Sequence, residues 1–503
     1  MQGLQATAVT IEVNATRGVR FVLVGLPDNA VKESHERILA AIENSGFTFP
    51  TRQITINLSP ADIRKEGSGY DLPMAIGILA TEDKVNTSQL RKYMMVGELS
   101  LDGSLVPIRG ALPVAIKARE MGFEGLFVPE GNIREAAVVN KLKVYGVKHI
   151  TQVVNHLNGT ALLEPTVVDT RGEFYARQYE FDYDFADVKG QEHVKRAMEV
   201  AAAGGHNIIM IGPPGSGKSM LAKRMPSILP PLSLQESLET TQIHSVAGTL
   251  PAGCSLMAQR PYRSPHHTIS QVALVGGGTN PQPGEISLAH NGILFLDELP
   301  EFQRSVLEVL RQPLEDRVIN VSRAKYSVTF PCSFMFVASM NPCPCGYYNH
   351  PTKACCCTPG QIVRYLNKIS GPLLDRIDLQ IELSPVPFSD LSKMEPGEPS
   401  EKIRERVIRA RKIQEERFRD YALIHSNAQM TEKMLGQYCV LDSQTTEVLR
   451  EAMIRLNLSA RAYSRILKVA RTIADLEGKE NIEFAHVAEA VGYRTLDRSS
   501  WGE

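Results

Sequence analysis

The pattern of hydrophobic and polar positions divides the chain into three regions. Residues 1–160 alternate strand-like runs with stretches of helical periodicity, such as 28–45. Residues 188–384 repeat this alternation with short, fully apolar runs, which are typical of buried parallel strands. Residues 401–503 have helical periodicity nearly throughout. We therefore predict an α/β multidomain protein, in which two α/β domains are followed by a helical one.

Two segments of different composition separate these regions. In 161–187 the apolar periodicity fades, and charged and aromatic residues mix in the run TRGEFYARQYEFDYDF. Residues 385–400 (PVPFSDLSKMEPGEPS) are rich in proline and serine. Both are predicted to be linkers, because such residues interrupt regular elements.

Composition narrows the class of protein. The formal net charge is -1 over 503 residues, so total charge does not indicate a protein that coats nucleic acid, and any such role must rest on local residues. No apolar run reaches the roughly 18–20 residues that a membrane helix needs. We expect a cytoplasmic protein without a membrane partner.

A phosphate-binding loop is the strongest local motif. GPPGSGKS fits G-x-x-x-x-G-K-[ST], follows the apolar run NIIMI and precedes a helical pattern. Backbone N–H groups of such a loop wrap the phosphates of ATP, the lysine reaches the β- and γ-phosphates, and the serine hydroxyl binds Mg²⁺. The predicted nucleotide ligands are Gly212, Pro213, Pro214, Gly215, Ser216, Gly217, Lys218 and Ser219.

Acidic and amide residues follow two further apolar runs. ILFLDE ends in Asp297, which we expect to hold Mg²⁺ with Ser219, and in Glu298, which we expect to polarise the attacking water. Asn341 ends the run FMFVASMN, where its amide would orient that water or, alternatively, cap a loop. Together with the phosphate loop, these residues predict ATP hydrolysis.

Five of the eight cysteines fall between residues 343 and 357. In a cytoplasmic protein, such a cluster favours a metal site over disulfides. Four thiolates would suit a tetrahedral Zn²⁺ site, with His350 as a possible substitute for one sulfur and a metal-free, reduced loop as the main alternative. The adjacent His266 and His267 would point to opposite faces of a strand, so we expect structural or substrate-contact roles for them.

Four segments together resemble one family: GPPGSGKS, LVGGGTNPQPGEISLAHNGILFLDE, ASMNPCPCGYY and SGPLLDRIDL. They are similar to the ComM/YifB type of magnesium-chelatase-like AAA+ ATPases, over essentially the whole chain. The resemblance implies a Lon-protease-like N-terminal domain (ribosomal S5 domain 2-like), a AAA+ P-loop core and a helical C-terminal lid. It also implies a hexameric helicase-like ring that acts on DNA, with branch migration during natural transformation and recombination proteins as partners.

The resemblance also implies individual roles. Arg376 looks like an arginine finger that completes the site of a neighbouring subunit, with a surface salt bridge to Asp375 or Asp378 as the alternative. Arg461 looks like the lid arginine that senses the γ-phosphate, and Arg465, one helical turn on, competes for that role. The family's cysteine pattern supports a zinc set of Cys343, Cys345, Cys355 and Cys357.

Two inserted hairpins are expected in the central domain, one in the segment VGGGTNPQPGE and one in VINVSRAKYSVTF (318–330). In related ring motors such hairpins face the central pore. Arg323 and Lys325 at the second tip would contact DNA phosphates, which gives affinity without sequence preference. The alternative is an ordinary solvent-exposed tip.

Two other functions compete with a DNA motor. A chelatase-type ATPase would remodel a protein partner instead of DNA. A Lon-type protease would need a serine and a lysine together, but Gly69 occupies the serine position, and Leu112 or Pro113 the lysine position, in our alignment. Ser68 and Lys117 are the nearby residues that could replace them.

Overall fold

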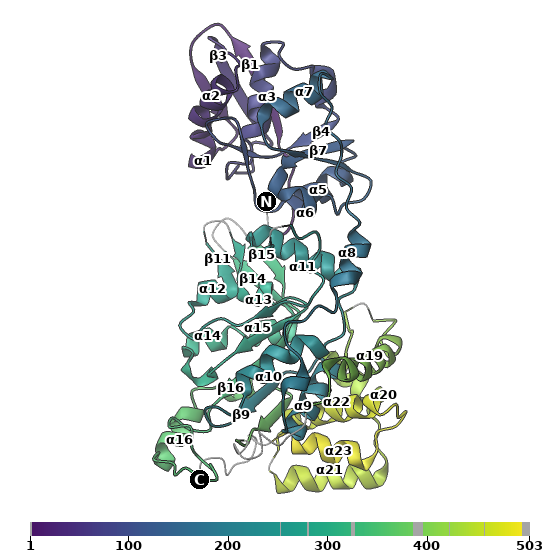
Figure 1. Cartoon of the computed structure of the whole chain (residues 1–503). Helices are drawn as coiled ribbons and strands as arrows, with labels where there is room; N and C mark the ends of the chain where they lie inside the picture. Colours follow the sequence, from purple (N-terminus) through teal and green to yellow (C-terminus); the bar gives the residue numbers. More distant parts are fainter. Residues whose placement is uncertain are drawn as a thin grey trace. The chain divides into compact units, whose positions relative to one another are not determined.

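The computed structural model describes residues 3–251, 253–278, 281–322, 327–385, 396–421, 423–456 and 458–494. The chain forms two compact units (Figure 1). The first comprises Met1–Ala176 with Ser237–Met257, and the second comprises Arg177–Glu236 with Ala258–Glu503. The segment 237–257 therefore packs with the first unit, although the sequence pattern had placed it in the central region.

The first unit contains a three-stranded sheet in the order β1-β3-β2. β1 (Thr10–Thr16) pairs antiparallel with β3 (Gln53–Ser59), and β2 (Phe21–Val24) pairs parallel with it. Alternate side chains of β3 are buried (Ile54, Ile56 and Leu58), as the period of two in a half-buried strand requires. The associated helices are α1 (Asn29–Lys32), α2 (Ser34–Asn44) and α3 (Asp71–Thr81).

A second sheet of the same unit is parallel and has the order β4-β7-β8. Its strands are β4 (Tyr93–Met95), β7 (Gly125–Pro129) and β8 (Lys143–Val147). The hairpin β5 (Glu98–Leu99) and β6 (Leu105–Val106) lies between them in sequence. The remaining helices of this unit are α4 (Thr87–Leu90), α5 (Ala111–Glu120), α6 (Ile133–Ala136), α7 (Ile150–Asn158) and α8 (Thr170–Arg177). The predicted linker 161–187 thus contains helix α8, and Phe174 of this helix is buried.

The second unit is built on a five-stranded parallel sheet in the order β10-β13-β16-β9-β17. Its three central strands are wholly buried, which confirms the short apolar runs predicted as parallel strands. The strands are β10 (Tyr262–Arg263), β13 (Ile293–Leu296), β16 (Met335–Met340), β9 (Ile208–Ile211) and β17 (Leu379–Glu382). Because all five run the same way, the loops after β9, β13 and β16 meet at one edge of the sheet.

Helices and hairpins surround this sheet (Figure 1). The two predicted hairpins form as β11 (Gly276–Gly277) with β12 (Gln282–Pro283), and β14 (Val318–Ser322) with β15 (Ser327–Pro331). The helices are α9 (Glu192–Gly204), α10 (Lys218–Arg224), α12 (Gln271–Val275), α13 (Glu285–Leu288), α14 (Arg304–Glu308), α15 (Arg311–Asp316), α16 (Pro359–Leu366) and α17 (Gly371–Leu374). Helix α11 (Leu234–Ala247) begins in this unit and continues in the other.

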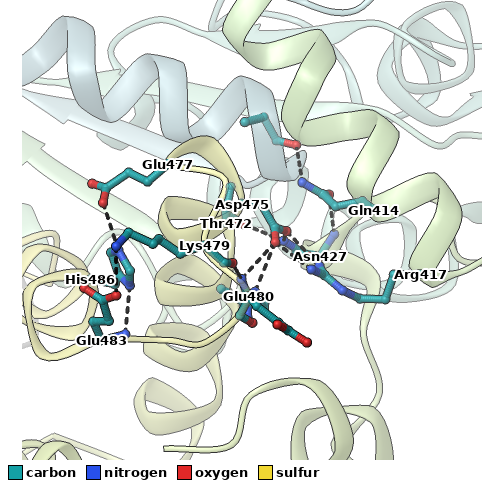
Figure 2. Close-up of polar contacts among 12 residues, drawn as sticks. Gln414, Arg417, Asn427, Thr472, Asp475, Glu477, Lys479, Glu480, Glu483 and His486 are labelled. Atoms are coloured by element: carbon teal, nitrogen blue, oxygen red, sulfur yellow. Dashed lines mark hydrogen bonds and ion pairs between the residues drawn. The ribbon is translucent and has the colours of Figure 1, made fainter.

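The C-terminal region is helical, as predicted. It contains α19 (Ser400–Arg417), α20 (Glu432–Tyr438), α21 (Ser443–Arg455), α22 (Ala460–Leu476) and α23 (Phe484–Gly492). A buried polar network joins α19 and α22, in which Asp475 accepts hydrogen bonds from Arg417 and Asn427 (Figure 2). None of the helices in the described part of the chain combines the length and apolar character needed to cross a membrane.

Candidate nucleotide site

The phosphate loop connects the end of β9 to the start of α10. Gly215 and Gly217 have φ angles of 80° and 90°, in the left-handed region that favours glycine. At Gly212, a Cβ would lie 2.8 Å from the backbone oxygen of Leu383 and from Oγ of Ser216, so no side chain fits there. The loop therefore combines turns that glycine adopts readily with a close backbone approach at Gly212, as expected of a loop that wraps phosphates.

Lys218 is buried at the first position of α10. Its Nζ donates hydrogen bonds to the backbone oxygens of Gly212 at 2.6 Å and Pro213 at 3.0 Å, and to Oδ1 of Asn341 at 3.2 Å. Burial lowers the pKa of Lys218, although nearby Asp297 and Glu298 oppose this effect. The amine thus lies within the loop and next to the strand-end amide, where it can reach a bound phosphate.

Asp297 lies directly after β13 and next to the phosphate loop. Ser219 donates a 2.6 Å hydrogen bond to Oδ2 of Asp297, and Ser339 donates to its Oδ1. A hydroxyl and a carboxylate held together are the oxygen ligands that Mg²⁺ takes in such sites. The predicted pair of Ser219 and Asp297 therefore fits a Mg²⁺ ion. Ser339 was missed from the sequence, although parallel pairing of Leu296 with Ala338 places it beside Asp297.

Glu298 follows with a left-handed backbone (φ 53°), which turns the chain sharply at the strand end. Its side chain is 55% exposed, and Oε2 lies 3.9 Å from Nδ1 of His267. A carboxylate that is reachable by water, beside the phosphate loop, fits the predicted role of polarising a water molecule. His267 is a second residue of this site whose place the sequence did not indicate.

Arg376 lies at the other edge of the sheet. The side-chain amide of Asn207, which directly precedes β9, donates to the backbone oxygen of Arg376 at 2.9 Å. The Arg376 guanidinium donates to the backbone oxygen of Pro372 at 2.5 Å and to Glu315 of α15. Its backbone N–H also donates to the backbone oxygen of Leu373 at 3.0 Å, and none of these partners belongs to the phosphate loop.

The two candidates for the lid arginine, Arg461 and Arg465, line the same pocket as Arg376. Arg461 donates a 2.7 Å hydrogen bond to Asp375, and Arg465 a 2.9 Å bond to Asp378, which is fully buried. Burial raises the pKa of Asp378, but Arg465 and His206 lower it by more. The pKa of Asp378 therefore falls well below the usual range. A pocket on this side is lined by Glu315, Asp375, Arg376, Glu432, Arg461, Ser464, Arg465 and Lys468. Four cations thus meet in one pocket away from the chain's own phosphate loop.

The four predicted cysteine ligands come together. The sulfur atoms of Cys343, Cys345, Cys355 and Cys357 all lie within 4.8 Å of one another. Cys343 is 3.3 Å from Cys345 and 3.7 Å from Cys355, close to the roughly 3.8 Å between sulfurs that a tetrahedral Zn–S distance of about 2.3 Å implies. The donor set therefore fits Zn²⁺, and the exposed Cys356 stays outside it.

Comparison with known proteins decides the family. The chain is 44% identical to "Competence protein ComM" of Haemophilus influenzae over 505 residues, which cover 99% of this chain and 96% of that protein. It is 44% identical to the protein YifB of Escherichia coli over 503 residues, with coverage of 99% and 96%. The chain belongs to the ComM/YifB family of magnesium-chelatase-like AAA+ ATPases. The match extends through both compact units, so the family covers the whole architecture described above.

Family models agree with this membership of the ComM/YifB family. Residues 184–391 match the model described as magnesium chelatase, subunit ChlI, residues 11–132 match subunit ChlI of Mg-chelatase, and residues 397–494 match the C-terminal part of that subunit. The chain is also 31% identical to Lon protease 2 of Bacillus subtilis over 157 residues, which cover 28% of this chain and 27% of the protease. The predicted Lon-like character is thus supported for part of the chain.

Two groups of predicted residues remain to be placed in this ComM/YifB-family chain. Ser68 contacts Glu98, and Lys117 pairs with Glu120 at 3.2 Å, so these two side chains do not form a serine–lysine pair with each other. The hairpin β14–β15 forms, but the predicted DNA contacts Arg323 and Lys325 lie outside the described residues.

Proposed function

We propose that this chain hydrolyses ATP with Mg²⁺ and couples hydrolysis to movement along DNA, as a hexameric ring in the cytoplasm. ATP hydrolysis is supported mainly by one observation. Lys218, Asp297 and Asn341 lie together at one edge of the sheet. In this proposal Lys218 neutralises the phosphates, Ser219 and Asp297 hold Mg²⁺, and Glu298 activates the water that Asn341 orients.

The ring is supported by the position of the arginines. Arg376 and Arg461 lie on the side of Asn207, at the end of β9 opposite Gly212. From there they are poorly placed to reach a nucleotide in their own subunit. Acting on a nucleotide in a neighbouring subunit gives both residues the charge-neutralising roles expected of an arginine finger and a lid sensor.

DNA as the substrate is supported by family membership and by the inserted hairpins. The relative in Haemophilus influenzae is named a competence protein, and competence concerns the uptake of DNA. The hairpin β14–β15 carries Arg323 and Lys325 between its strands, where cations would bind phosphates without reading bases. We propose branch migration in support of recombination during natural transformation, with recombination proteins as partners.

The four-cysteine cluster is proposed to hold a structural Zn²⁺ ion. Thiolates at the observed spacing are the ligands that zinc takes in closed structural sites. Held by Cys343, Cys345, Cys355 and Cys357, the ion would cross-link two short segments that are separated by nine residues.

The deciding experiment measures the ATPase rate of the full chain with no DNA, with single-stranded DNA and with branched DNA. Lys218→Ala is the blank, because it removes the phosphate-contacting amine. Stimulation by DNA that is lost in this variant supports the proposal. A rate that is indifferent to every DNA rejects the DNA motor and favours a chelatase-type ATPase that remodels a protein.

A further inference from the structure

The cysteine loop is joined to the candidate nucleotide site at both of its ends. Its first end begins two residues after Asn341, the amide that contacts Lys218. Cys343 is fully buried there, and its backbone oxygen accepts a 3.0 Å hydrogen bond from the N–H of Gly346. The turn that carries the first two thiols is therefore continuous with the end of β16.

Gly346 brings this turn onto the phosphate loop. It has a φ of 82°, and a Cβ at this position would lie 2.6 Å from Cδ of Pro214. The glycine therefore packs directly on the proline ring, closer than any other residue would allow. Pro214 is in the middle of the loop that would wrap the phosphates, so this contact limits where the loop can move.

The second end of the cysteine loop returns to the same strand end. Helix α16 begins two residues after Cys357, with Thr358 and Gln361 forming a capping box. Tyr365 of this helix is buried, which raises the pKa of its hydroxyl, and the nearby backbone of Asn341 opposes that shift. The segment from Asn341 to Tyr365 thus leaves the nucleotide site and returns to it. Its two arms are the outgoing part with Cys343 and Cys345 and the returning part with Cys355 and Cys357, and the thiols hold these arms together.

We propose that the cysteine centre, when it holds Zn²⁺, is a clamp that regulates nucleotide binding. With the arms tied, Gly346 stays against Pro214 and Tyr365 stays against Asn341, so the phosphate loop and the strand-end amide keep the geometry that ATP needs. Without the ion, the arms are joined by thiol contacts alone, and the loop gains conformational freedom that ATP binding must remove. This inference rests on the proposed ATP site.

The test measures two quantities on the full chain: zinc per chain by elemental analysis, and affinity for a fluorescent ATP analogue. Wild type is expected to carry one zinc. Cys345→Ser is expected to lose it and to bind the analogue at least tenfold more weakly, whereas Cys356→Ser, whose side chain lies outside the cluster, is expected to match wild type. Chelator-treated wild type should lose the same affinity and regain it with added Zn²⁺, which separates the clamp from misfolding of the variant.

Gly346→Ala tests the mechanical link itself. Its four thiols are unchanged, so it should keep zinc, but the added Cβ collides with Pro214 and should weaken analogue binding by about tenfold, or ~1.4 kcal/mol. Zinc-free wild type, or zinc loss with unchanged analogue affinity, overturns the clamp. Wild type that holds zinc but binds no ATP analogue overturns the proposed ATPase, and that failure is distinguishable because the zinc content is normal.

Discussion

The side-chain amide of Asn207 donates a hydrogen bond of 2.9 Å to the backbone oxygen of Arg376. Asn207 directly precedes β9 and Gly212 directly follows it, so this bond fixes Arg376 at the sheet edge opposite the phosphate loop. The four residues of β9 separate the two edges by roughly 13 Å, at about 3.3 Å per residue. The bond therefore joins Arg376, which we propose serves a neighbouring subunit, to the end of β9 that lies away from the candidate nucleotide site.

Arg376→Ala and Lys218→Ala are expected to be inactive alone but to complement each other when mixed. The arginine finger contributes about 10³–10⁵-fold to the rate in related phosphoryl-transfer systems. In a mixed ring, the intact phosphate loop of an Arg376→Ala subunit meets the intact arginine of a Lys218→Ala neighbour, which restores a fraction of complete sites. ATPase rates of the mixtures at varied ratios measure this.

The matched control for that experiment is Arg450→Ala. Arg450 is a surface arginine that pairs with Glu447 within its own helix, so the variant should hydrolyse ATP at the wild-type rate. Mixtures of the two inactive variants that show no activity at any ratio would mean that Arg376 serves its own subunit.

Sequence patterns predicted those parts of the site that local order determines. The phosphate loop and Asp297 each follow an apolar run directly, so strand, turn and chemistry are adjacent in sequence. The cysteine cluster was also predictable, because its members lie within fifteen residues, and the resemblance to the family singled out the four whose sulfur atoms come together. The pairing between strands that are distant in sequence was not predictable. For this reason Ser339 and its hydrogen bond to Asp297 were missed.

The position of Arg461 could not be predicted for the same reason, because it too depends on contacts between segments that are far apart in sequence. Helical periodicity predicted its helix, but which side of the sheet α22 packs against depends on contacts such as the bond from Arg465 to Asp378. Likewise, the apolar pattern of 237–257 does not indicate that this segment packs with the first unit. Tertiary contacts between segments far apart in sequence decide both.

Ser339→Ala is expected to raise the Mg²⁺ concentration required for half-maximal ATPase activity by about 10–100-fold, the usual effect of removing a group that orients a metal ligand. The Ser339 hydroxyl donates to one oxygen of Asp297 while Ser219 donates to the other. Loss of the first bond lets the carboxylate rotate. Mg²⁺ titrations at saturating ATP measure the change, with Ser333→Ala, a serine just before β16, as the control.

Asp475→Asn is expected to destabilise the helical region by roughly 3–5 kcal/mol, because it leaves the buried Arg471 and the partly buried Arg417 without their counter-charge. Asp475 has a fully buried side chain that accepts from Arg417 at 2.6 and 2.7 Å and from Arg471 at 3.1 Å. Urea unfolding followed by circular dichroism should show a lower transition midpoint. Glu447→Gln, which breaks an exposed pair with Arg450, should change the midpoint little, and equal effects would contradict this account.

The stability of the second unit is expected to fall as pH decreases from 7 to about 5.5, partly through His206. This histidine is fully buried between Thr472, at 2.8 Å from Nε2, and Asp378, at 3.5 Å from Nδ1. Burial lowers the pKa of His206, with Lys468 and Arg411 acting in the same direction and Asp378 opposing them.

The direction follows from proton uptake by the two states. Below pH about 6.5 the unfolded chain protonates this histidine, whereas the folded chain keeps it neutral until its lower pKa is reached. The free energy of unfolding should therefore fall by up to about 1.4 kcal/mol per pH unit within that window. Urea midpoints measured at several pH values should show a shallower slope for His206→Gln than for wild type. His35→Gln, at a partly exposed histidine of the other unit, should keep the wild-type slope, and an unchanged slope in His206→Gln would assign the pH dependence to other groups.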